Sequence, residues 1–421
     1  MKTNSKNSLV AIAAIATLSM AFFAPSAKAA ITLPKGSWPV CASATDAYCI
    51  ESVTLTPDGG KPSILSFGTS GAAAANPDVT SGKPLAGHWG SSDWTAATLG
   101  AAGYDGIFVD AHQANDYVPW VYVDVQPALG SALAVQSANK SYAANLDKNI
   151  AIGIKLHLGT IKTGVTFGVG QDVTTVIADT SGLASIVIDG YPTTVPVAGS
   201  SKDCKGTAGK AVALVNQFQS VIVPQNDPLG FGIDGAAGNL YVGSNGTCSL
   251  STPVWDADSK HFRYTSSAPA LSPDGSKTNK GFYHAVISFA DAKAYWGLAK
   301  PQDAAQALTV SILTSAGGST AAIATVSAKN NFITIDTTNF DFPDALLDIA
   351  LNPTYNGTSA GPDATNSSAA AKATATSAAA KANQKIKANV SKTSTITCVK
   401  GKSTTKVSGV KPICPKGYTK K

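Results

Sequence analysis

The sequence predicts a mainly β protein with two β-sandwich-like domains and a few short helices. Glycine, threonine, valine and serine are abundant, and Glu51 is the only glutamate among the acidic residues. Aspartate favours turns and strand ends, whereas glutamate favours helices. Short apolar runs also recur with turn sequences between them, a spacing typical of sandwiches rather than of βαβ units.

The first expected hairpin joins strands at 50–56 and 63–67 through Asp58 and Gly59. Asp-Gly between apolar runs predicts a hairpin because glycine adopts positive φ without a steric penalty. A further strand is expected at 117–125, where Pro119 favours a sheet edge.

The clearest expected strand covers 150–158, where large aliphatic residues occupy every second position. This period of two predicts one buried face and one exposed face. Similar patterns predict strands at 164–169, 173–179, 185–189, 240–243, 262–265, 282–289, 308–314, 321–327 and 332–336.

Helices are expected in four short segments, 92–99, 208–218, 291–298 and 301–307. The last has proline at its first position and Asp303 in its first turn, which is a common helix start.

Composition divides the chain into five segments. The boundaries are 1–29 for a signal peptide, 30–200 and 201–352 for two β-rich domains, 353–392 for a linker and 393–421 for a tail. The break between the domains is expected near 197–205. The linker is rich in Ala, Ser, Thr and Lys and has few large apolar side chains, so we expect it to be disordered.

The first 29 residues have the pattern of a secretory signal peptide. Lys2 and Lys6 precede an apolar run at 9–24, and small residues follow in an A-x-A pattern. The run is shorter than the roughly 20 residues of a membrane-spanning helix, which is the alternative. We expect cleavage after Ala29 and no transmembrane segment in the mature chain, which would be secreted and associated with the cell surface.

The mature chain has an even number of cysteines in three local couples, which predicts disulfides in an exported protein. The expected pairs are Cys41–Cys49, Cys204–Cys248 and Cys398–Cys414. Zinc is the alternative, but the chain has no C-x-x-C motif and no histidine close in sequence to a couple.

Charge is distributed unevenly. Residues 363–421 contain twelve lysines and one aspartate, whereas residues 30–362 contain seventeen basic and twenty-five acidic side chains. An acidic body argues against nucleic acid as a partner, because phosphate binding needs a basic face. The tail predicts contact with an anionic cell-envelope polymer, and its expected contacts are Lys400, Lys402, Lys406, Lys411, Lys416, Lys420 and Lys421. A tail that only keeps the protein soluble is the alternative.

The tail carries a recognisable pattern, T-x-T-C-x-K-G-K at 395–402 and K-P-x-C-P-x-G-Y-x-K-K at 411–421. This pattern resembles the Lys-rich, two-Cys tail of many uncharacterised secreted or surface proteins of actinobacteria. Phrases of the body, G-F-Y-H-A at 281–285 and A-Y-W-G at 294–297, look similar to the same group. The resemblance implies an exported surface protein and brings no activity with it.

Chemical motifs are sparse, and the sequence identifies no catalytic residue and no cofactor. The G-x-S-x-G string at 357–361 lies in the linker, and a strand pattern rather than a helix follows the G-x-G-x-x-G string at 230–235. The best polar cluster contains Asp110, His112 and Asp116, which offer ligands for a metal or an acid–base pair. A strand followed by a polar turn is the simpler interpretation.

Trp89 and Trp94 are candidates for a sugar-stacking platform, although tryptophan more often packs in a sandwich core. These features together favour a non-enzymatic, wall-associated binding protein of unknown ligand. An extracellular polysaccharide hydrolase that uses Asp carboxylates and a structural surface-layer protein are the alternatives.

Overall fold

The computed structural model describes the body of the chain and the strands of the tail. The described residues are 33–68, 88–90, 106–115, 117–129, 132–133, 146–180, 182–225, 227, 238–250, 252–314, 323–355, 394–400, 403–409 and 419–420. The predicted signal peptide, the expected helix at 92–99 and most of the predicted linker lie outside these residues.

The described part is mainly β, as predicted. Its helices are α2 (Phe289–Trp296), the 3₁₀ turn η1 (Pro301–Asp303) and α3 (Ala304–Ala307), which confirms the helices expected at 291–298 and 301–307. The Ser288 side chain accepts a hydrogen bond from the Asp291 backbone N–H and begins α2, and Gly297 ends it in the left-handed conformation at φ 69°.

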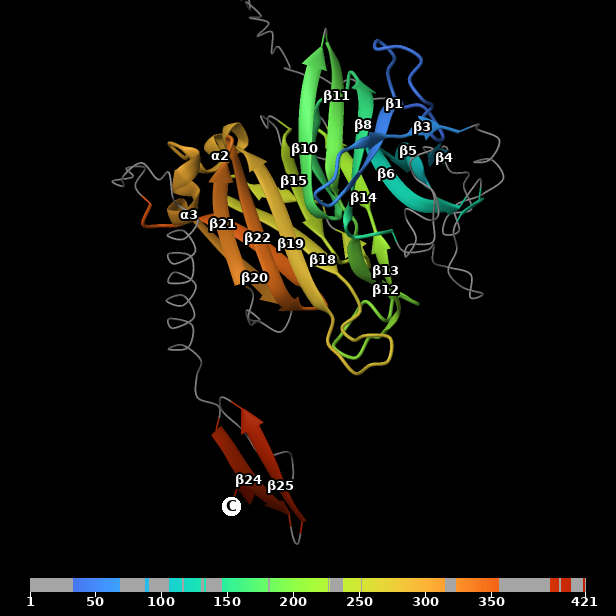
Figure 1. Cartoon of the computed structure of the whole chain (residues 1–421). Helices are drawn as coiled ribbons and strands as arrows, with labels where there is room; N and C mark the ends of the chain where they lie inside the picture. Colours follow the sequence, from blue (N-terminus) through green and yellow to red (C-terminus); the bar gives the residue numbers. More distant parts are fainter. Residues whose placement is uncertain are drawn as a thin grey trace, which may run out of the picture.

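One large sheet forms the centre of the molecule (Figure 1). Its strands, in spatial order, are β21 (Ile323–Lys329), β22 (Phe332–Asp341), β19 (Lys280–Ser288), β15 (Leu240–Ser244), β9 (Thr163–Val169), β14 (Gln219–Pro224), β6 (Val118–Leu129), β5 (Gly106–Asn115), β4 (His88–Gly90) and β3 (Ser66–Phe67). Strand β7 (Ala132–Leu133) pairs beside β6. The β15–β9 pair is parallel, and the other neighbours run antiparallel.

Smaller sheets complete the fold. The first has the order β10 (Gln171–Thr180), β11 (Leu183–Tyr191), β8 (Ile150–Gly159), β1 (Cys49–Pro57) and β2 (Ser63–Ile64). The second has the order β16 (Ser249–Leu250), β18 (His261–Ser267), β23 (Ala345–Leu351) and β20 (Leu308–Thr314), with β17 (Val254–Asp256) beside β18. A two-stranded sheet contains β12 (Thr193–Ala198) and β13 (Ala211–Gln217).

The first and second small sheets pack on opposite faces of the large sheet. Successive residues of a strand point to opposite faces. On β14, Ile222 belongs to the core shared with the first small sheet, whereas Val223 belongs to the core shared with the second. On β15, Tyr241 lies in the first core and Val242 in the second. Strands β9 and β15 are consequently buried along their whole length.

The two sandwiches therefore share their central strands. The predicted boundary near residue 200 does not separate the sheets, because β9 precedes it and pairs with β14 and β15, which follow it. Gly168 of β9 allows this close pairing, since a Cβ there would lie 2.0 Å from the backbone oxygen of Gln219. The segment 197–205 contains the end of β12 and the turn that leads toward β13.

Two local expectations are corrected by the structure. The segment 208–218, expected as a helix, contains strand β13, which pairs antiparallel with β12 and places Val215 opposite Val195. Strand β8 was expected to expose one face, but both of its faces are largely buried. Its outer face is covered because Gly153 lies against Thr54 and Asp189, and His157 lies against Glu51.

The tail contains a sheet of its own. Strands β24 (Ser394–Lys400) and β25 (Ser403–Gly409) pair antiparallel, and β26 (Thr419–Lys420) pairs with β24. The backbone pairing agrees with the expected hairpin. Cys414 lies outside the described residues, so its bond to Cys398 stays a prediction.

Candidate functional site

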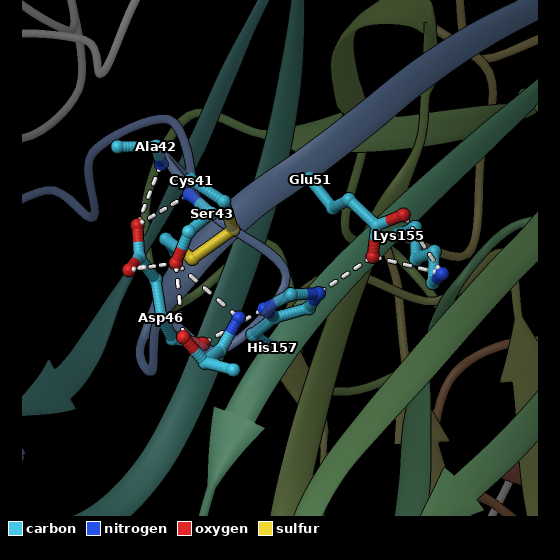
Figure 2. The surroundings of a disulfide bond; sticks show 9 residues. Cys41, Ala42, Ser43, Asp46, Glu51, Lys155 and His157 are labelled. Carbon is cyan, nitrogen blue, oxygen red and sulfur yellow. Dashed lines mark hydrogen bonds and ion pairs between the residues drawn. A yellow bond between two sulfur atoms is a disulfide. The ribbon is translucent and has the colours of Figure 1, made fainter. Parts of the chain in front are cut away.

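The N-terminal disulfide fastens a short loop to the outer face of the first small sheet. Cys41 and Cys49 are bonded, and Cys49 begins β1 (Figure 2). Asp46 closes the loop between them, because its carboxylate accepts hydrogen bonds from the backbone N–H groups of Ala42 and Ser43 at 2.6 and 2.9 Å. The disulfide Cys204–Cys248 is also present, so two of the three predicted pairs are confirmed.

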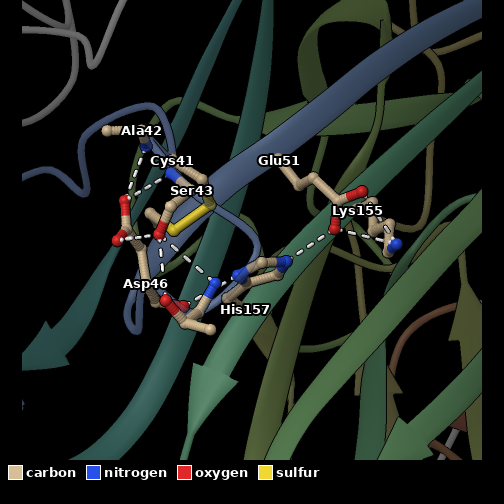
Figure 3. Close-up of polar contacts among 9 residues, drawn as sticks. Cys41, Ala42, Ser43, Asp46, Glu51, Lys155 and His157 are labelled. Carbon is tan, nitrogen blue, oxygen red and sulfur yellow. Dashed lines mark hydrogen bonds and ion pairs between the residues drawn. A yellow bond between two sulfur atoms is a disulfide. The ribbon is translucent and has the colours of Figure 1, made fainter. Parts of the chain in front are cut away.

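His157 connects this loop to β1. Its Nδ1 lies 2.7 Å from the backbone oxygen of Asp46, and its Nε2 lies 2.5 Å from Oε2 of Glu51 (Figure 3). A carbonyl oxygen and a carboxylate oxygen only accept hydrogen bonds, so both ring nitrogens of His157 face hydrogen-bond acceptors. We call Asp46, Glu51, Lys155 and His157 the His157 cluster.

Glu51 lies between Lys155 and His157. Lys155 Nζ lies 2.8 Å from each of its carboxylate oxygens, and His157 contacts one of them. Partial burial acts to raise the pKa of Glu51, but the hydrogen bonds from Lys155 and His157 outweigh it and hold this pKa below its usual value. Both ring nitrogens of His157 are occupied, so the cluster favours a structural role over proton transfer.

No motif in the sequence predicts the His157 cluster. The available signals were that Glu51 is the only glutamate and that His157 lies with Lys155 on the face of its strand opposite the aliphatic residues. The sulfur atoms of Cys41 and Cys49 lie close to His157, but in a disulfide they offer no thiolate to a metal.

The predicted polar cluster on β5 is partly formed. Asp110 and His112 share a face, with His112 Nδ1 at 3.0 Å from Asp110 Oδ2. This contact is not a hydrogen bond, because His112 Nδ1 is buried without a hydrogen-bond partner among the described residues. Asp110 Oδ1 is likewise buried without a hydrogen-bond partner there. The 3.0 Å separation of His112 Nδ1 and Asp110 Oδ2 is therefore an electrostatic contact. Asp116 lies outside the described residues.

The structure adds a second carboxylate that the sequence analysis missed. Asp124 of β6 lies directly opposite Asp110 and is 6 % exposed. It accepts hydrogen bonds from Gln126 Nε2 at 2.7 Å and Gln219 Nε2 at 2.9 Å. Asp110 and Asp124 are brought together by the register of β5 and β6, so no local sequence motif predicts their proximity. Two neighbouring buried carboxylates beside an imidazole are able to perform acid–base chemistry.

Of the two tryptophans in the predicted platform, the structure describes Trp89. Trp89 is 3 % exposed and packs in the first core, where its ring lies edge-on to Phe67 at a centroid separation of 5.3 Å. Trp94 lies outside the described residues. The side chains of the seven tail lysines are likewise not described.

Each histidine whose side chain the structure describes lies against a carboxylate. The pairs are His112 with Asp110, His157 with Glu51, His261 with Asp348, and His284 with Asp336. Arg263 contacts Asp348 as well, so that carboxylate has two cationic partners when His261 is protonated.

The comparisons with known proteins add no family. No protein-family model matches this sequence, and no curated protein is significantly similar to it. Among the described residues, no helix combines the length and the apolar character needed to cross a bilayer.

Proposed function

We propose that the protein is a secreted, non-enzymatic binding protein of the cell envelope, whose basic tail binds an anionic polymer. The observation that carries this proposal is the charge split between an acidic body and a tail with twelve lysines and one aspartate. A polyanion attracts the tail and repels the body, so the molecule would bind in one orientation.

The backbone pairing supports a tail that acts as a separate module. Strands β24, β25 and β26 form a sheet that shares no strand with the sheets of the body. The hairpin places Lys406 opposite Thr397 and the residue pair Lys400–Ser403 at its turn end. The disulfides support an oxidising location, because such bonds persist outside the reducing cytosol.

Sedimentation with purified cell walls tests the proposal. The full chain and a version ending at residue 362 are mixed with walls at low and high salt. We expect only the full chain to pellet, and we expect salt to release it, because exposed charges are screened within about 10 Å at 0.1 M salt. Equal pelleting of both versions would show that the body binds walls and would contradict the proposed role of the tail.

A polysaccharide hydrolase is the second candidate, and the adjacent buried carboxylates of Asp110 and Asp124 favour it. Replacement Asp110→Asn keeps the shape of the side chain and removes its charge. If the protein cleaves a wall polymer and the Asp110→Asn variant does not, the hydrolase proposal is supported. The matched control is Asp258→Asn in an exposed turn, which should leave any cleavage unchanged.

A further inference from the structure

Three strands bring two aspartates and a histidine together at the border of the first small sheet. His284 of β19 lies directly opposite Asp336 of β22, and its Nδ1 is 2.6 Å from Asp336 Oδ1. Asp172, near the start of β10, completes the group. One ligand atom from each of the three residues lies within 4.8 Å of those of the other two.

A glycine makes this approach possible. Gly243 of β15 is the other cross-strand neighbour of His284. A Cβ at Gly243 would lie 2.9 Å from the backbone oxygen of Gly170, just before Asp172. The absence of a side chain therefore lets the start of β10 pass close over the large sheet beside His284. Asp172 itself has a φ of 52°, a conformation that aspartate and asparagine adopt more readily than most residues.

One ring nitrogen of His284 faces Asp336, and the other has no hydrogen-bond partner among the described residues. The His284 side chain is 8 % exposed, and its Nε2 is buried without a hydrogen-bond partner in the part of the chain that the structure describes. Burying such a nitrogen without a partner is unfavourable. No lysine or arginine among the described residues forms an ion pair with Asp172 or Asp336, so neither carboxylate is neutralised by a permanent cation.

We propose that Asp172, His284 and Asp336 bind a divalent cation of the zinc class. One imidazole and two carboxylates form a mixed nitrogen and oxygen ligand set, which suits Zn²⁺, whereas Ca²⁺ prefers oxygen ligands alone. Asp172 is exposed and Asp336 is half-exposed, which leaves water free to complete the coordination. The bound cation would join β10 of the first small sheet to β19 and β22 of the large sheet, and so stabilise their packing.

This proposal is independent of the envelope-binding function. It needs no polymer and no tail, and it concerns a face where the two sheets meet. The pair His261 and Asp348 provides an internal comparison, because its Nδ1–Oδ1 contact of 2.8 Å is similar but Arg263 already contacts the same carboxylate. We therefore expect that pair to contribute nothing to cation binding.

Calorimetric titration of the EDTA-treated, full-length protein with Zn²⁺ and with Ca²⁺ tests the site. We expect one Zn²⁺ site, an increase in Tm on Zn²⁺ addition, and little response to Ca²⁺. Asp172→Asn should weaken Zn²⁺ binding about tenfold or more, since even outer-shell changes at metal sites cost that much. Asparagine tolerates the positive φ, so this variant should fold. The matched control His261→Asn should bind Zn²⁺ like the unmodified protein.

Imidazole ¹H–¹⁵N spectra provide a second readout. Zn²⁺ should shift the ring nitrogens of His284, assigned by their disappearance in His284→Gln, and leave those of His261 unchanged. The proposal is overturned if Zn²⁺ does not bind, if Asp172→Asn binds it as tightly as the unmodified protein, or if the His284 signals do not respond. An equal response to Ca²⁺ that survives His284→Gln would also overturn it.

Discussion

His157 Nε2 lies 2.5 Å from Glu51 Oε2, and this contact ties the centre of the first small sheet to the strand that leads out of the N-terminal disulfide loop. Residue 157 pairs with Cys49 in the strand register, and its Nδ1 reaches the loop at Asp46. One imidazole thus connects β8, β1 and the loop between the two cysteines.

Glu51→Gln should reduce stability most at neutral pH. The carboxylate is half-exposed, so we expect a loss of about 1 kcal/mol in the free energy of unfolding. Because the folded pKa of Glu51 lies below its usual value of 4.5, its contribution is complete above pH 4.5 and disappears as the pH falls through the folded pKa. Urea denaturation at pH 7 and at pH 3 measures this difference. A gap between the two proteins that widens at pH 3 would contradict the assignment, and Asp258→Asn is the control.

The two disulfides of the body should differ in their contributions to stability. The cysteines of Cys41–Cys49 are 8 residues apart, and those of Cys204–Cys248 are 44 apart. Loop-closure entropy in the unfolded chain predicts about 2–3 kcal/mol for the first bond and about 4 kcal/mol for the second. Denaturation of the two double-alanine variants measures the order. A larger loss from the short loop would mean that native contacts of the His157 cluster, rather than chain entropy, determine the effect.

The shared central strands predict that the body unfolds in one cooperative transition. Ile222 and Val223 are neighbours on β14, yet they pack in opposite cores. Each replacement by alanine should cost about 2–4 kcal/mol and shift the same calorimetric transition. Two resolved transitions, each sensitive to only one of the replacements, would instead indicate independent domains.

Tyr283→Phe should be costly because this hydroxyl joins the large sheet to the second small sheet. It accepts hydrogen bonds from the Ser266 backbone N–H at 3.0 Å and from Ser266 Oγ at 3.1 Å, and donates to the Ala345 backbone oxygen. Its removal leaves buried groups without a partner, at a cost of about 1–3 kcal/mol. Burial raises the pKa of Tyr283 to about 12, despite the hydrogen bonds from Ser266, so the folded protein should ionise it only in strong base.

Tyr264→Phe is the matched control for Tyr283→Phe. Tyr264 is buried in the same core, but its hydroxyl has no hydrogen-bond partner among the described residues. Its removal should leave the free energy of unfolding unchanged or slightly increased. Urea denaturation measures both variants. An equal loss of unfolding free energy in Tyr283→Phe and Tyr264→Phe would show that the Tyr283 hydroxyl does not specifically stabilise the contact between the two sheets.

Local pattern was sufficient where neighbouring residues carry the information. The alternation at 150–158, the turn at Asp58 and Gly59, and the spacing of Cys41 and Cys49 each specify a strand, a hairpin or a bond within one short segment. The segment 208–218 misled the prediction because its apolar spacing suits a short helix as well as a strand. Pairing with β12 decided between them, and that information lies outside the segment.

The sequence by itself determined the β class, most of the strands, two disulfides and the charge split, because these depend on composition and local order. Only the tertiary structure decided that two sandwiches share β14, β9 and β15, and that Asp110 faces Asp124. It also decided that Asp172 reaches His284 and Asp336 from another sheet. These relationships depend on strand order and register. Burial of both faces of the central sheet sets the order and register, and no short segment of sequence contains that information.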